Sequence, residues 1–131
     1  MRITLAFDKV STLRITILIK GHEEQVDVIL DTGYTSHAGH GLSLPINGFG
    51  KYAELADEKR PVKTGHGEEL HPFIPNVQIL RIRDYRLRES VIIPTVIMGE
   101  IALLGALFLQ NCTIHLDGRK KSGYLDLNPR W

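Results

Sequence analysis

The chain has little of what marks several common classes of protein. It holds one cysteine, Cys112, among 131 residues, which excludes an internal disulfide framework and fits a reducing compartment. Its 16 basic and 15 acidic residues nearly cancel, so bulk charge attracts neither nucleic acid nor an anionic membrane surface. The N-terminus carries Asp8 and Lys9 early and lacks the apolar block of a signal peptide. These features predict a cytoplasmic protein.

The chain also lacks a clean hydrophobic run that could cross a bilayer. The nearest candidate, residues 91–109, is interrupted by Pro94, Gly99, Glu100 and Gly105. A carboxylate in the middle of such a span is costly in lipid. We therefore interpret the segment as a strand, a turn and a second buried element, and expect no membrane partner.

What the chain does have is a globular composition with many strand signals. Hydrophobic residues make up 43% and charged residues 24%, which at this length suits one domain, residues 1–131, with a real core. Residues 13–21 and 25–30 alternate apolar and polar side chains on either side of a Gly-His-Glu-Glu turn. This pattern predicts a β-hairpin that leads directly into Asp31.

Further elements follow the same kind of pattern. Glycine-rich residues 37–50 predict a loop with a short extended piece at 42–45, and residues 51–60 predict a helix stopped by Pro61. Three more hairpins are expected, over residues 61–74, 76–93 and 112–127. Seven or eight short strands and at most two short helices indicate an all-β sandwich or barrel.

The first hairpin ends on Asp31-Thr32-Gly33, a sequence that suits catalysis. Glycine allows a tight turn, and the threonine hydroxyl can bond neighbouring backbone and fix the loop. One carboxylate alone is a poor catalyst of amide hydrolysis. Two close carboxylates cannot both ionise, so they share a proton and act as acid and base.

These residues resemble a known motif. "VILDTGYTS" (28–36) resembles the active-site motif of the retropepsin-like aspartic proteases, and "RITILIKGHEEQVDVIL" (14–30) resembles their opening hairpin. "PVKTGHGEELHPF" (61–73) resembles the flap hairpin over the cleft, and "IALLGALFLQNCTIHLD" (101–117) resembles the second signature. "LDTGYTS" and "LSLP" together resemble a bacterial and archaeal branch of the family. The resemblance covers roughly residues 12 to 127.

The resemblance implies the acid protease fold: a closed, single-lobe β-barrel with one or two short helices that homodimerises. Asp31 is the one Asp followed by Thr/Ser-Gly, so a catalytic pair needs Asp31 from each of two chains. The implied activity is that of an aspartic endopeptidase. One Asp31 takes a proton from a water that attacks the scissile carbonyl, while the other, protonated, hydrogen-bonds the carbonyl oxygen. The substrate is a peptide or protein, and no metal or organic cofactor is needed.

The resemblance also implies roles for other residues. Thr32 would tie the two active-site loops together, Gly33 would allow their close approach, and Leu104 with Gly105 would support the loop from behind. Gly65, His66 and Gly67 would lie at or near the flap tip. The terminal segments, 1–7 and 123–131, could pair across the dimer interface.

This chain departs from the family pattern in two places. Tyr34 stands where many retropepsins have a small residue, and residues 37–41 form an unusual insertion. A bulky ring beside Asp31 would occupy cleft volume or stack on substrate. An alternative function is therefore a catalytically silent dimer that binds peptides or proteins.

Three other groups of residues receive plainer interpretations. A nucleic-acid surface over Arg81, Arg83, Arg86 and Arg88 is a weaker alternative, because interleaved aromatics are scarce, so we expect no nucleic-acid partner. His37, His40, His66 and His71 are interpreted as exposed loop histidines, and no metal site is expected. Cys112 is interpreted as a buried structural thiol.

Overall fold

The chain is mostly β. The structure is a computed structural model and describes residues 1–6, 12–31, 41–64 and 67–131. In these ranges the elements are β1 (Arg2–Ala6), β2 (Thr12–Ile19), β3 (His22–Leu30), β4 (Leu42–Leu44), α1 (Ile46–Ala53), β5 (Glu58–Thr64), β6 (Gly67–Ile82), β7 (Tyr85–Ile97), β8 (Leu103–Leu104), α2 (Ala106–Leu109), β9 (Thr113–Asp117) and β10 (Ser122–Asp126). The strands exceed the expected seven or eight. β4 coincides with the extended piece expected at 42–45, whereas the two-residue β8 is too short to leave an alternating pattern.

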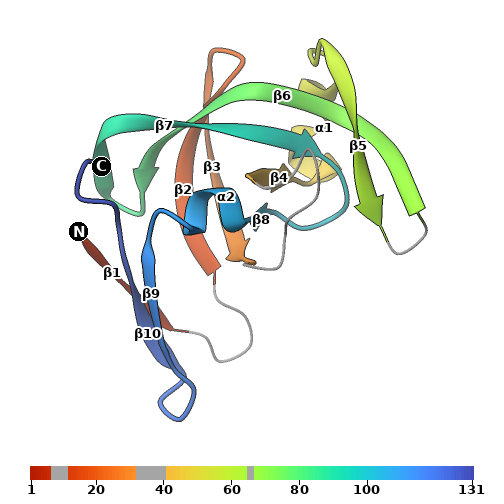
Figure 1. Ribbon diagram of the computed structural model, residues 1–131. Coiled ribbons are helices and arrows are strands. Elements are labelled where there is room, and N and C mark those ends of the chain that lie inside the picture. Colours follow the sequence, from red (N-terminus) through yellow and green to blue (C-terminus); the bar gives the residue numbers. More distant parts are fainter. Residues whose placement is uncertain (7–11, 32–40, 65–66) are drawn as a thin grey trace.

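Seven strands form the main sheet, in the order β2-β3-β8-β4-β7-β6-β5. β2 also pairs with β6, so the sheet curls back on itself (Figure 1). Its concave side holds the core, to which β2 contributes Leu13, Ile15, Ile17 and Ile19, each at most 1% exposed. Burying a side chain of this size contributes roughly 1.5–3 kcal/mol, so alternate positions of β2 hold the sheet together.

The hairpin of β2 and β3 is confirmed, but its turn is tighter than expected. Ile19 pairs with His22, and the turn consists of Lys20 and Gly21. Both have positive φ, 49° and 81°, as the favoured two-residue hairpin turn requires. The predicted Gly-His-Glu-Glu turn was therefore too long, because β3 already begins at His22. β3 separates Asp31 from the turn by its whole length.

β6 is one continuous strand of 16 residues that belongs to two hairpins. Its first half pairs with β5, with Thr64 opposite Gly67, and its second half pairs with β7, with Ile82 opposite Tyr85. Both of these predicted hairpins are confirmed. Figure 1 shows β6 arching over the molecule from the β5 side to the β2 side.

The helix predicted at 51–60 was placed too late. α1 ends at Ala53, and residues 58–60 already belong to β5 together with Pro61. Phe49 and Tyr52, three residues apart, are both buried. Their packing on the core therefore stabilises the helix, although Gly48 has a non-helical backbone conformation. β5 is the last strand of the sheet order, and an edge strand tolerates a proline because its open side needs no N–H.

The segment 91–109 forms strand, turn and buried helix, as expected. It comprises the end of β7, the two-residue β8 and the one-turn helix α2. In the part of the chain that the structure describes, no helix is long and apolar enough to span a membrane.

The chain ends form a second, three-stranded sheet in the order β1-β10-β9. Arg2 lies opposite Asp126, and its guanidinium donates to both carboxylate oxygens at 2.9 and 3.2 Å. β1 and β10 pair with each other within one chain, and the expectation that the terminal segments pair across a dimer stays a prediction. Both termini consequently lie on the same side of the molecule (Figure 1).

The Arg2–Asp126 pair predicts an acid-dependent loss of stability. The hydrogen bond from Arg2 lowers the pKa of the Asp126 carboxyl below 3.8. A lowered folded-state pKa contributes stability above the unfolded-state value, and this contribution is lost as pH falls through the folded-state value. The stability difference between wild type and Asp126→Asn should therefore be constant at neutral pH and shrink below 3.8. Urea unfolding across this pH range measures it.

Salt provides the control for this prediction. The pair is exposed, so added salt should reduce the difference at neutral pH. A difference that stays constant from neutral pH to well below 3.8 would contradict the assignment of the lowered pKa to this pair.

Candidate active site

Asp31 follows the last residue of β3 and is half-buried. The N–H of Asp31 donates to the carbonyl of Leu104 at 3.0 Å, and the N–H of Ile29 donates to Ala102 at 2.8 Å. β3 and β8 therefore run parallel, with Leu30 opposite Leu104. The backbone of Asp31 is fixed by the segment that was expected to support it.

β8 is held equally firmly on its other side. Leu42 of β4 lies opposite Leu104, and the N–H of Gly105 donates to the carbonyl of Gly41 at 2.7 Å. β4 in turn pairs with β7, with Leu42 opposite Thr95. Asp31 is thus the end of a ladder that runs β7-β4-β8-β3. The side chains of Leu42 and Leu104 are fully buried beneath it.

Several predicted site residues lie outside the described ranges. These are Thr32, Gly33, Tyr34, Gly65 and His66, together with the insertion 37–41 except for Gly41. Gly67 is described: it is exposed, opens β6 and has φ +109°, a value that favours glycine. The structure therefore brings Asp31, Leu104 and Gly105 together, and it places Gly67 at the end of the β5–β6 hairpin.

The β5–β6 hairpin, which the sequence predicted to be a flap, is anchored by a small apolar cluster. Val62 and Phe73 pack with Val96 of β7, and all three are buried, while Met98 covers them in part. The Arg60 guanidinium lies 4.8 Å from the centre of the Phe73 ring. This cluster is separate from the main core, so it joins the base of the hairpin to β7.

His71 is placed differently from the sequence prediction, and two arginines of the predicted basic cluster lie opposite each other. His71 is not in a loop: it lies in β6, with its Nε2 3.2 Å from a Glu69 carboxylate oxygen. Arg81 lies directly opposite Arg86 on the outer face of the β6–β7 hairpin, where like charges repel. Within the described ranges, no group of three or more His, Cys, Asp or Glu side chains is placed to hold a metal.

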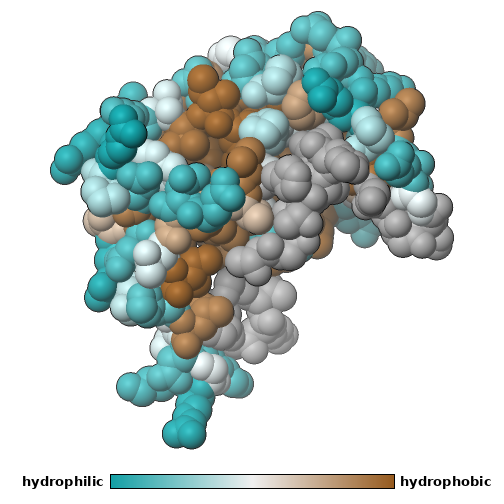
Figure 2. All heavy atoms as spheres, in the orientation of Figure 1, coloured by the Kyte–Doolittle hydropathy of each residue, from teal (hydrophilic) through white to brown (hydrophobic). Residues whose placement is uncertain are grey.

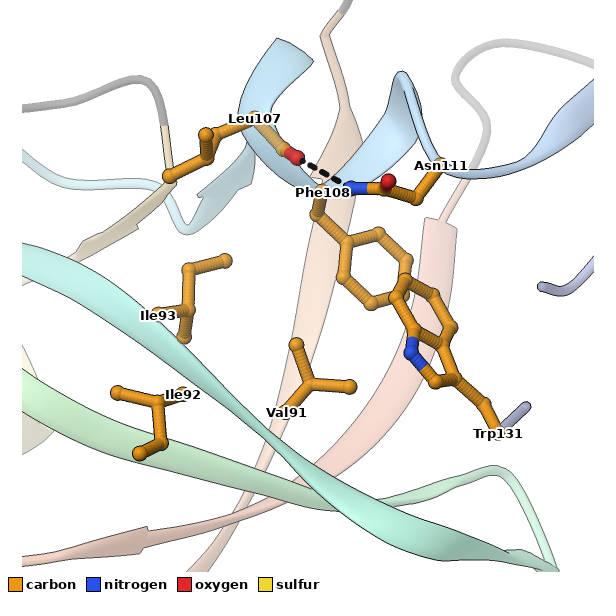
Figure 3. Close-up of a pocket in the computed structure, with 7 residues that line it drawn as sticks. All are labelled: Val91, Ile92, Ile93, Leu107, Phe108, Asn111 and Trp131. Carbon is orange, nitrogen blue, oxygen red and sulfur yellow. Dashed lines mark hydrogen bonds between the residues drawn. The ribbon is translucent and has the colours of Figure 1, made fainter.

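A pocket of about 190 Å³ lies away from Asp31. Its lining residues are Val91, Ile92, Ile93, Leu107, Phe108, Asn111 and Trp131. Figure 3 shows them converging from β7, α2 and the C-terminal segment, with Trp131 stacked on Phe108 at 4.9 Å between ring centres. None of these side chains is ionisable, and Figure 2 shows apolar atoms gathered across the middle of the same view as Figure 1. The pocket is therefore an apolar seam without catalytic groups.

The comparisons with known proteins support the fold. No protein-family model matches the chain, and no curated protein matches it. Solved structures that resemble it include the crystal structure of a retropepsin-like aspartic protease from Rickettsia conorii, with a TM-score of 0.57 and 15% sequence identity. The match covers 97% of this chain and 91% of that one. The chain thus shares the retropepsin-like fold, and the predicted fold class is confirmed to that extent.

Cys112 is half-buried in the segment after α2, and its Sγ lies 3.8 Å from the carbonyl of Phe108. Burial raises the pKa of its thiol from 9.0 to about 11. The thiolate is the reactive form, so this environment agrees with a structural thiol.

This pKa predicts slow alkylation of Cys112. At pH 8, a thiol pKa of about 11 in place of 9.0 lowers the thiolate fraction about 100-fold. The rate of reaction with iodoacetamide should therefore be roughly 100-fold lower in the folded chain than in urea. Cys112→Ser serves as the blank for other reactive groups. Equal rates in the folded and unfolded chain would contradict the raised pKa.

Proposed function

We propose that this chain is an aspartic endopeptidase that works as a homodimer. The observation that carries the proposal is the position of Asp31, half-buried at the end of β3 and bonded through its N–H to Leu104. The chain shares its fold with an aspartic protease over nearly its whole length. A carboxylate that directly follows a strand and stands on a fixed backbone suits a reaction that needs fixed geometry.

In the proposed mechanism, Asp31 of each chain faces its symmetry mate across a two-fold axis. One carboxylate accepts a proton from the attacking water as the water adds to the scissile carbonyl carbon. The other, protonated, donates a hydrogen bond to the carbonyl oxygen and then helps to protonate the leaving nitrogen. No metal or organic cofactor takes part.

The proposal includes the parts of the site that complete the cleft. The whole chain forms one closed, barrel-like lobe, and the β5–β6 hairpin covers bound peptide as a flap, with its tip at Gly65, His66 and Gly67. Thr32 and Gly33 fix the meeting of the two Asp31 loops. Tyr34 borders the substrate and shapes its selection.

Replacing Asp31 tests the function directly. Asp31→Asn keeps the size of the side chain and the main-chain bond to Leu104, but it removes the group that accepts and donates the proton. Cleavage of a denatured protein at mildly acid pH should fall on the order of 10³-fold. Circular dichroism and sedimentation should show the fold and oligomeric state unchanged.

Asp27→Asn is the matched control. Asp27 lies in β3, the strand that Asp31 follows, is exposed, and forms two hydrogen bonds with Arg14 at 2.9 and 3.1 Å. This variant makes the same chemical change four residues away, and it should cleave as the wild type does. Cleavage that survives Asp31→Asn would reject the assignment. Peptide binding without any Asp31-dependent cleavage from acid to neutral pH would favour the silent binding dimer.

Mixing chains tests whether two copies of Asp31 form one site. If a fixed amount of wild type exchanges subunits with an equal amount of Asp31→Asn, half of the wild-type chains enter mixed dimers. Activity should then fall to about half, because each mixed dimer carries one carboxylate. Asp27→Asn added in the same amount should not lower it. Undiminished activity after proven subunit exchange would show that each chain works alone.

A further inference from the structure

Gly41 occupies the tightest place in the ladder that ends at Asp31. A Cβ atom built on Gly41 would collide with the carbonyl oxygen of Pro94 and with Cγ1 of Ile93, both in β7. The backbone oxygen cannot rotate away as the end of a flexible side chain could. Gly41 is not among the glycines held at positive φ, so close approach, and not backbone conformation, makes glycine necessary here.

The contact of Gly41 with β7 is linked to Asp31 by main-chain bonds. The carbonyl of Gly41 accepts from the N–H of Gly105 at 2.7 Å, and the carbonyl of the preceding residue, Leu104, accepts from the N–H of Asp31 at 3.0 Å. Each link is a hydrogen bond between backbones, which leaves little freedom for local adjustment. A displacement of Gly41 from β7 is therefore transmitted through β8 to Asp31.

We propose that Gly41 is a positioning residue that sets where Asp31 stands relative to β7, by allowing β4 to lie against Ile93 and Pro94. This inference rests on the proposed function of Asp31. An added methyl group at position 41 forces the chain away from β7 by a sizeable fraction of an ångström, and a misplacement of about 1 Å can lower a rate about 100-fold.

The β7 side of the contact has its own support. Thr95 is fully buried, and its hydroxyl donates to the carbonyl of Ile93 at 3.1 Å. This bond spans Pro94, whose own nitrogen has no hydrogen to donate. Thr95 therefore holds the stretch of backbone against which Gly41 packs.

Gly41→Ala tests the proposal, with Gly21→Ala as its matched control. Gly21 has φ +81° and no atom within 4 Å of a built Cβ, so alanine there introduces strain without a collision. It lies in the turn at the other end of β3, about 30 Å from Asp31 measured along the strand. Both variants should lower the melting temperature, which separates the effect on stability from the effect on the site.

We expect Gly41→Ala to lower kcat and to leave KM almost unchanged. At a temperature where both variants are folded, Gly41→Ala should lower kcat by about 10- to 100-fold with KM changed less than about twofold. Gly21→Ala should keep the wild-type kcat. Equal kcat values for the two variants would overturn the proposal.

Hydrogen exchange of the Asp31 amide gives a readout that does not depend on proteolysis. Gly41→Ala should speed this exchange about tenfold or more relative to amides of the β6–β7 ladder, and Gly21→Ala should not. If the wild type shows no Asp31-dependent cleavage, the proposed function fails, and the exchange result alone then decides the positioning role. An unchanged Asp31 amide in Gly41→Ala would reject that role.

Thr95→Val provides a second route if Gly41→Ala does not fold. It keeps the volume of the side chain and removes the hydroxyl that holds Ile93. A several-fold loss of kcat that Thr95→Ser restores would support the proposal. An unchanged kcat, together with an unchanged Asp31 amide, would overturn it.

Discussion

The two-residue strand β8 is the constraint on which the candidate site depends. On one side, the carbonyl of Leu104 accepts a hydrogen bond from the N–H of Asp31. On the other side, the N–H of Gly105, the residue that follows β8, donates to the carbonyl of Gly41. A strand of this length has almost no cohesion of its own, so its position is set by β3 and β4 and by the burial of Leu104. The position of the Asp31 backbone consequently depends on four paired strands, β7, β4, β8 and β3.

This construction separates the geometry of the site from its chemistry. Main-chain groups fix the backbone of Asp31, and they are the same for any amino acid except proline at that position. The apolar side chains of Leu42 and Leu104 exclude water from beneath the ladder, which strengthens hydrogen bonds within it. The side chain at position 31 can therefore be selected for reactivity without changing how its strand is held.

Sequence patterns predicted the long hairpins and failed on the short contacts. Alternation and turn residues were sufficient for β2–β3, β6–β7 and β9–β10, because each pattern extends over many residues. The helix predicted at 51–60 was placed too late, because the helix-forming residues at 58–60 pair with β6 as part of β5. Asp31 was predicted as a site residue from its Thr-Gly context, whereas Gly41 resembled any other residue of a glycine-rich loop. Its need for glycine comes from Pro94, 53 positions away, and no local pattern contains that contact.

Pro61 has a consequence beyond the error it caused in the helix prediction. It lies in β5, the outermost strand of the main sheet, between Lys59 and Lys63. A proline offers no N–H to an incoming strand, and a lysine such as Lys59 on an edge strand disfavours pairing with another chain. The exposed border of the sheet is thus a poor template for further strands. Stacking of many copies into fibrils is therefore disfavoured at this edge of the main sheet.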